Sequence, residues 1–222
     1  MMPFPGGIEA LPNGTLILSV AAALLYLPVQ GRAPSLRRTA VKTAATALLA
    51  VLALMQGGPW LLVAALVLSA VGDALLAQDG DRPFLAGLAS FLAAHLAYVA
   101  LFVSVGGGTD ILTWQPWRLA IAAVAVLGAI VLMRRLIPAA GPSMRLPVAT
   151  YAAAILAMML AAATVPSPLI LAGAALFVLS DSLLAIGRFL MAPGAPRQRP
   201  VGAMVWIFYY LAQAAITLGF LL

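Results

Sequence analysis

Residues 60–77 read WLLVAALVLSAVGDALLA, an apolar run of 18 residues in which Asp73 is the one charged side chain. A membrane-spanning helix needs about 20 predominantly apolar residues, so this stretch is long enough to cross a bilayer. A carboxylate at the centre of such a helix costs about 2.5–3.5 kcal/mol on insertion scales and therefore needs a reason. The run predicts a membrane helix that carries a functional side chain.

The same apolar character extends over the whole chain. Of its 222 residues, 64% are hydrophobic and 8% are charged, whereas soluble domains carry about 25% charged residues. The chain has no cysteine and one histidine, which removes thiolate nucleophiles and cysteine ligands and leaves too few side chains for a typical zinc site. The composition excludes an ordinary soluble domain, and we predict an integral membrane protein without a metal or cofactor.

Clusters of Pro, Gly and charged residues divide the chain into eight apolar stretches. Most breaks are short, and the longer ones are 106–116 and 192–200. We therefore predict an all-α, polytopic membrane helix bundle in which residues 1–222 form a single transmembrane domain. The expected helices are 14–29, 37–55, 60–77, 84–105, 117–135, 145–164, 168–189 and 201–221.

The basic residues indicate an orientation, because cytoplasmic loops and helix ends are enriched in Lys and Arg. The basic residues lie in the connections that follow the first, third, fifth and seventh predicted helices, all on one side of the membrane. In that order they are Arg32, Arg37 and Arg38; Arg82; Arg134, Arg135 and Arg145; and Arg188, Arg197 and Arg199. The opposite side receives Arg118 alone. We therefore expect both termini to be non-cytoplasmic, and we interpret the net charge of +6 as topology rather than nucleic-acid binding. The Ala-, Gly- and Arg-rich composition favours a bacterial inner membrane.

A weak internal repeat links two of the predicted helices. Gly72-Asp73-Ala74-Leu75-Leu76-Ala77 matches Ser180-Asp181-Ser182-Leu183-Leu184-Ala185. In the helices before them, Arg38, Val41, Thr43 and Ala50 match Arg145, Val148, Thr150 and Ala157. These matches raise the alternative of a parallel pseudo-repeat of two four-helix halves, although alanine and leucine align with many sequences.

Few polar side chains fall inside the predicted spans. At 1.5 Å per residue, Asp73 and Asp181 each lie roughly 10 Å from the cytoplasmic face. Lys42 and Tyr151 enter their helices from that face and reach about the same layer. Further polar side chains lie deeper, up to about 17–18 Å from that face: His95, Gln213, Tyr209 and Tyr210. Polar groups from six helices therefore converge in depth on the cytoplasmic half of the membrane.

Two carboxyl groups and one lysine leave an acid in excess, and burial favours its protonated form. A protonated acid beside an ionised one suits general acid–base catalysis. We therefore predict that Asp73 and Asp181 are catalytic, with structural ion pairing as the rival explanation. His95 lies on an aromatic stripe that is equally typical of packing. Tyr210 and Gln213 form a second stripe, which interhelical hydrogen bonding explains as well.

Together these residues resemble the lysoplasmalogenase family, also called the YhhN-like membrane proteins. The resemblance covers the second to the eighth predicted helix. It depends on Gly72-Asp73 with Leu75-Leu76, on Phe84, Gly87, Phe91, His95 and Tyr98, on Tyr151 with Met158, on Ser180-Asp181-Ser182 with Leu184-Ala185 and Phe189, and on Tyr209-Tyr210 with Gln213. Each motif is short, but their order and spacing make the match specific.

The resemblance implies a hydrolase that cleaves the vinyl-ether bond of a lysoplasmalogen, a lysophospholipid in the surrounding membrane lipid, to a fatty aldehyde and a glycerophospho-alcohol. On this hypothesis one of Asp73 and Asp181 donates a proton while the other stabilises the cation and activates water. Lys42 would meet the substrate phosphate. His95, Tyr151, Tyr210 and Gln213 would orient water or the glycerol hydroxyl.

Two other functions remain open at this point. In a transporter or lipid-binding protein, Asp73 and Asp181 would form a proton or cation relay between the two halves. In a purely structural bundle, replacing either aspartate would change stability alone. Neither the physiological lipid nor the oligomeric state follows from the sequence.

Overall fold

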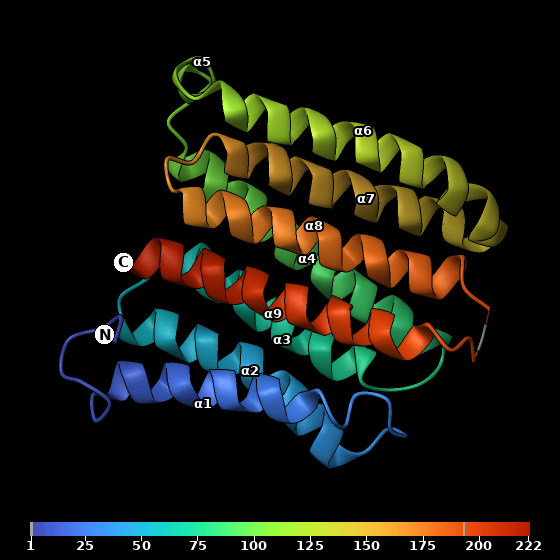
Figure 1. Cartoon of the computed structure of the whole chain (residues 1–222), viewed down its shortest axis with the longest axis horizontal. Helices are drawn as coiled ribbons and strands as arrows, with labels where there is room; N and C mark the ends of the chain where they lie inside the picture. Colours follow the sequence, from blue (N-terminus) through green and yellow to red (C-terminus); the bar gives the residue numbers. More distant parts are fainter. Residues whose placement is uncertain (1, 193) are drawn as a thin grey trace. The chain divides into compact units, whose positions relative to one another are not determined.

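The computed structural model describes residues 2–192 and 194–222, and within these residues the secondary structure is helical, without strands. The helices, shown in Figure 1, are α1 (Leu11–Tyr26), α2 (Leu36–Met55), α3 (Trp60–Leu76), α4 (Asp81–Val105), α5 (Asp110–Trp114), α6 (Pro116–Ala139), α7 (Gly141–Ala163), α8 (Pro168–Phe189) and α9 (Gln198–Leu221). They form two compact units: residues up to Tyr98 together with Thr217–Leu222, and Val99–Ile216.

In the first unit, α2 packs against both α1 and α3. The hydroxyl of Ser19 on α1 donates a 2.6 Å hydrogen bond to the carbonyl of Ala45 on α2. Ser35 caps α2 by accepting a 3.2 Å hydrogen bond from the N–H of Arg38, which satisfies a donor that the first helical turn leaves open. Gly57, with φ of +67°, allows the tight turn into α3.

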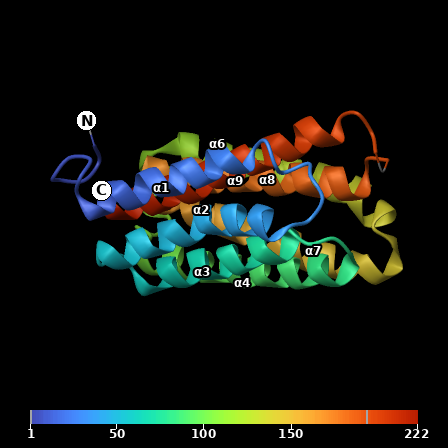
Figure 2. The same cartoon turned by 90° about the horizontal axis from the view of Figure 1, so that it is seen from below.

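The helices α3 and α4 approach closely, and Figure 2 shows them side by side. A Cβ atom on Gly72 would lie 2.6 Å from the ring of Phe91, and one on Gly87 would lie 2.7 Å from the side chain of Leu76. Two glycines therefore create the space that the facing side chains fill, as small residues do between membrane helices. This contact also fixes which way the next residue, Asp73, faces.

In the second unit, α6, α7 and α8 lie side by side (Figure 1). Arg118, near the start of α6, is fully buried and donates to the carbonyls of Val165 at 2.7 Å and Pro166 at 2.9 Å, with a longer 3.3 Å bond to Ala163. Helix ends leave carbonyls without helical partners, and this guanidinium satisfies those that follow α7. Arg118, the one basic residue assigned to the non-cytoplasmic side, therefore stabilises the end of α7.

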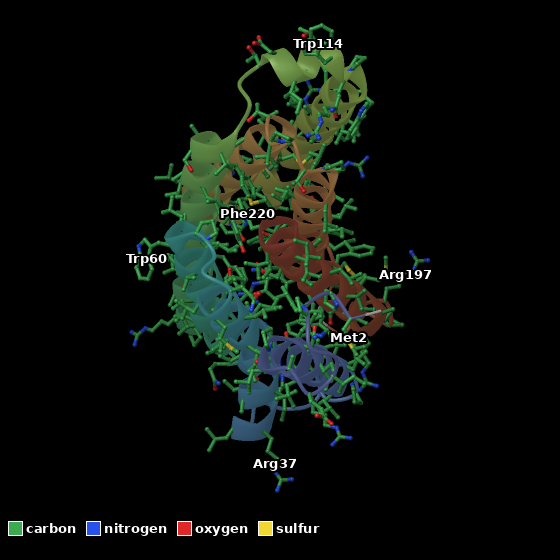
Figure 3. The ribbon with its side chains drawn as sticks, turned by 90° about the vertical axis from the view of Figure 1, so that its left-hand side faces the viewer. Met2, Arg37, Trp60, Trp114, Arg197 and Phe220 are labelled. Atoms are coloured by element: carbon green, nitrogen blue, oxygen red, sulfur yellow. The ribbon has the colours of Figure 1, made fainter. Side chains whose placement is uncertain are left out.

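Within the described residues, six helices are long and apolar enough to cross a membrane: α2, α4, α6, α7, α8 and α9. The chain is an integral, multi-pass membrane protein. The helices α1 and α3 are also apolar but have 16 and 17 residues, close to the lower limit of about 17 for a span. Trp60, the first residue of α3, is 73% exposed and points away from the ribbon (Figure 3), as is typical of an aromatic anchor at a membrane interface.

The predicted break between the fifth and sixth helices was wrong. Residues 136–144 were expected to form a loop, but α6 continues to Ala139 and α7 begins at Gly141. Pro138 lies in the last turn of α6, and Pro142 occupies the start of α7, where its missing N–H costs no hydrogen bond. Arg134, Arg135 and Arg145 are therefore helical residues.

Other boundaries moved by a few residues. The first helix was expected at 14–29 but spans Leu11–Tyr26, because Pro12 fits its first turn and Pro28 has no N–H with which to continue the helical hydrogen bonds. The helix α4 begins at Asp81, inside the predicted polar turn, and α9 begins at Gln198 rather than 201. The loop 106–116 contains α5. The seventh predicted helix, 168–189, has the same bounds as α8.

Candidate active site

Asp73 is held by two side chains of the neighbouring helix α2. Nζ of Lys42 lies 3.4 Å from Oδ1 of Asp73, and Oγ1 of Thr46 donates a 2.8 Å hydrogen bond to Oδ2. The exposed fraction is 1% for Asp73 and 11% for the lysine. Since one partner of the carboxylate is a cation and both oxygens accept, this geometry suits the ionised form of Asp73.

The arrangement around Asp73 follows from helical spacing. Lys42 and Thr46 are four residues apart on α2, so they share one face. The ring of Tyr26 on α1 lies 5.9 Å from Nζ of Lys42, at the outer range of a cation–π contact. Sequence reasoning found Lys42 but missed Thr46 and Tyr26. The four-residue spacing from Lys42 was the available signal for Thr46, whereas nothing in the sequence pointed to Tyr26.

His95 is anchored to the contact between α3 and α4. Its Nδ1 lies 2.7 Å from the carbonyl oxygen of Phe91, the residue that packs against Gly72. A carbonyl can only accept, so Nδ1 carries the hydrogen, and Nε2 of the neutral ring is an acceptor. His95 is fully buried. Whether it acts on a substrate stays a prediction.

Asp181 on α8 is held by a phenol instead of an ammonium group. The hydroxyl of Tyr151 on α7 donates a 2.5 Å hydrogen bond to Oδ2 of Asp181. Asp181 is half-buried, whereas Asp73 is buried. The preceding residue, Ser180, donates a 3.0 Å hydrogen bond to the carbonyl of Val205 and so joins α8 to α9. The second aspartate is therefore the more accessible of the two.

An aromatic group on α9 packs against α8 one turn from Asp181. The ring of Phe177 meets Tyr209 edge-on at 5.5 Å, and Trp206 lies 5.7 Å from Tyr209. Tyr210 stacks on Trp206 at 6.3 Å, and Gln213, one turn further along α9, is fully buried. The predicted roles of Tyr210 and Gln213 stay predictions.

Each aspartate thus bonds to a side chain of the helix that precedes its own. The partners, however, do not occupy matching positions of the repeat. The alignment that pairs Arg38 with Arg145 places Ala149 opposite Lys42 and Ala44 opposite Tyr151. The shared aspartates could therefore be found by internal comparison, while their different partners could not.

The chain is similar to one known protein family and to two curated proteins. The model of the YhhN family matches residues 37–220. The chain belongs to the YhhN family. Two curated relatives of this YhhN protein, from Mycobacterium bovis and Mycobacterium tuberculosis, are each named lysoplasmalogenase and are 33% identical to it over 165 residues. No solved structure matches it.

The matches cover different shares of the proteins compared. The aligned region is 72% of this YhhN protein and 59% of each mycobacterial relative, so the chain matches less than two thirds of their length. The family match contains Asp73, Asp181 and Lys42, together with the partners Thr46 and Tyr151. Helix α1 lies outside it. The contact of Tyr26 with Lys42 therefore joins a residue outside the matched range to one inside it.

Proposed function

We propose that this YhhN protein is a lysoplasmalogenase-like hydrolase that cleaves the vinyl-ether bond of a lysoplasmalogen. The observation that carries the proposal is the buried Asp73 with its cationic and hydroxyl partners, in a chain 33% identical to proteins named lysoplasmalogenase. A carboxylate of this kind within apolar helices is costly to insert and marks functional sites in membrane proteins.

The chemistry needs an acid and a group that stabilises a cation. A proton adds to the alkenyl carbon remote from the ether oxygen and produces an oxocarbenium ion. Water adds to that ion, loses a proton and forms a hemiacetal, which collapses to a fatty aldehyde and a glycerophospho-alcohol. The reaction consumes one water and returns the proton, so it requires general acid–base groups and no redox partner.

The contacts favour separate roles for the two aspartates. Lys42 and Thr46 support Asp73 as an anion that stabilises the oxocarbenium ion and accepts the proton of the attacking water. Asp181 is then the proton donor, with Tyr151 orienting its carboxyl group. Nζ of Lys42 has three hydrogens, so it can bind a substrate phosphate as well as Asp73.

His95, Tyr210 and Gln213 complete the proposed substrate site by orienting water or the glycerol hydroxyl. We further propose that α1 and α3 cross the membrane with the six longer helices, giving eight spans in one transmembrane domain with both termini non-cytoplasmic. The basic helix ends support this orientation. The proposed location is a bacterial inner membrane.

The test is incubation of the purified protein with a panel of lysolipids that includes a vinyl-ether lipid and its ester analogue. We expect fatty aldehyde from the vinyl-ether lipid and no fatty acid from the ester, with both products measured by mass spectrometry. Fatty acid release without aldehyde would replace the proposal with an esterase. Proton-coupled lipid uptake into liposomes without product would replace it with a transporter.

A further inference from the structure

One face of α2 is polar along its first half. Thr39, Lys42, Thr43 and Thr46 are spaced by three, one and three residues, which places them on a single helical face. That face is turned toward α3. Nε2 of Gln78, just after α3, donates a 2.9 Å hydrogen bond to Oγ1 of Thr39, and Lys42 and Thr46 both contact Asp73. The hydrogen bond between Gln78 and Thr39 is exposed, and the one between Thr46 and Asp73 is buried.

Two hydroxyl groups on this line have no hydrogen-bond partner among the described residues: Oγ1 of Thr43 and Oγ of Ser69. Ser69 is fully buried on α3. It lies one turn before Asp73 and so on the same side of that helix. Serine inside a membrane helix commonly donates to the carbonyl four residues earlier, but this one does not. A buried hydroxyl without a hydrogen-bond partner is energetically unfavourable, and a bound water molecule would remove that cost.

The register of α3 against α4 brings another polar group to the level of Ser69. Gly72 faces Phe91 and Leu76 faces Gly87. The numbering rises along α4 as it falls along α3, so one turn beyond the contact of Gly72 with Phe91, His95 on α4 lies level with residues 68 and 69 on α3. Both His95 and Ser69 are fully buried. The polar line begins at an exposed pair and ends in the interior of the first unit.

We propose that the contact between α2 and α3 holds a chain of water molecules that leads from the Thr39–Gln78 pair past Asp73 to Ser69. A buried water needs two to four polar partners, and the ammonium hydrogens of Lys42, the carboxylate of Asp73 and the two hydroxyls supply them along the line. The entrance lies near the start of α2, where Arg37 is exposed and points outward (Figure 3). If the proposed hydrolysis is correct, this chain supplies its water.

The chain contains no cysteine, so single cysteines can report hydration directly. We would introduce Ser69→Cys and Thr43→Cys, with Val67→Cys and Val71→Cys as controls. These valines bracket Ser69 in depth and are each 47% exposed on the outer surface of α3. The proteins are reconstituted in phosphatidylcholine liposomes and treated with a small, water-soluble methanethiosulfonate. The rate of mixed-disulfide formation is measured by mass spectrometry of the intact chain.

Thiols react as thiolates, which form in water and not in lipid, so we expect both path cysteines to react at least about tenfold faster than the valine controls. A reagent restricted to the face where α2 begins should be sufficient. Equal slow rates at Ser69→Cys, Thr43→Cys and the controls would overturn the proposal, as would reaction from the opposite face alone. The labelling does not depend on turnover, so an inactive protein with fast labelling would reject the hydrolase function and retain the hydrated path.

Discussion

The hydroxyl of Tyr151 donates a 2.5 Å hydrogen bond to Oδ2 of Asp181, and this bond joins α7 to α8. If it orients the proton donor, Tyr151→Phe removes the hydroxyl and keeps the ring. We expect kcat for aldehyde release to fall about 10- to 100-fold while KM changes little. In the background of Asp181→Asn, the same change should cause no further loss, because the two side chains act as a unit. Additive losses would show that Tyr151 acts independently.

Replacement of either aspartate by asparagine tests the acid–base pair. Asp73→Asn and Asp181→Asn keep the shape of the side chain but cannot exchange a proton, so each should reduce turnover at least about 100-fold. Asp79→Asn, in the exposed turn after α3, is the matched control and should be active. Monodispersity in detergent checks that the variants fold. Near-normal aldehyde release by a folded Asp73→Asn or Asp181→Asn protein would reject the mechanism.

The ion pair of Lys42 and Asp73 makes a prediction about stability. Lys42→Met leaves a buried carboxylate without its cation, and we expect a loss of about 3 kcal/mol, seen as a lower thermal midpoint in detergent. Adding Asp73→Asn to Lys42→Met should recover most of this loss, since the uncompensated charge is then gone. A double variant less stable than Lys42→Met would contradict this account of the pair.

Arg118 should stabilise the protein without taking part in the reaction. Arg118→Leu leaves the carbonyls of Val165 and Pro166 without their donor, and we expect a loss of about 3 kcal/mol in the free energy of unfolding. Gln115→Ala is the control, because Gln115 contacts only the Nε end of the same guanidinium at 2.7 Å and leaves the carbonyl bonds in place. Turnover per folded molecule should be unchanged in both variants.

The close contact of α3 and α4 predicts an asymmetric response to added methyl groups. Gly72→Ala would force the buried ring of Phe91 aside and should cost about 1–3 kcal/mol. Gly14→Ala, on α1 with no atom within 4 Å of the new Cβ, should be neutral or raise the thermal midpoint, since alanine favours a helix by about 1 kcal/mol over glycine. Adding Phe91→Leu should partly rescue Gly72→Ala. Equal midpoints for the two alanine variants would refute the contact.

The existence and order of the long apolar helices could be predicted because hydrophobic length is a strong signal. The end of α6 and the start of α7 could not be predicted, since Pro138 and Gly141-Pro142 resemble a loop until it is known that these prolines occupy terminal turns. Local sequence patterns describe chain breaks, whereas a proline in a terminal turn of a helix leaves the helix intact.

The candidate site shows a similar division. The cost of burying a carboxylate was sufficient to select Asp73 and Asp181, and helix rise brought Lys42 to the right depth. Partners from other helices depend on rotation about each helix axis, which depth arithmetic does not contain. Thr46 resembles any threonine in an alanine-rich helix, and it becomes significant once α2 is known to turn that face toward Asp73.

The glycine contact between α3 and α4 has a consequence for motion. Because the ring of Phe91 fills the space above Gly72, α3 cannot rotate about its axis without driving its own side chains into α4. Any rearrangement that carries Asp73 must therefore move the two helices together as a rigid pair. Separating Asp73 from its partners on α2 would therefore require sliding of that pair and not turning of α3 alone.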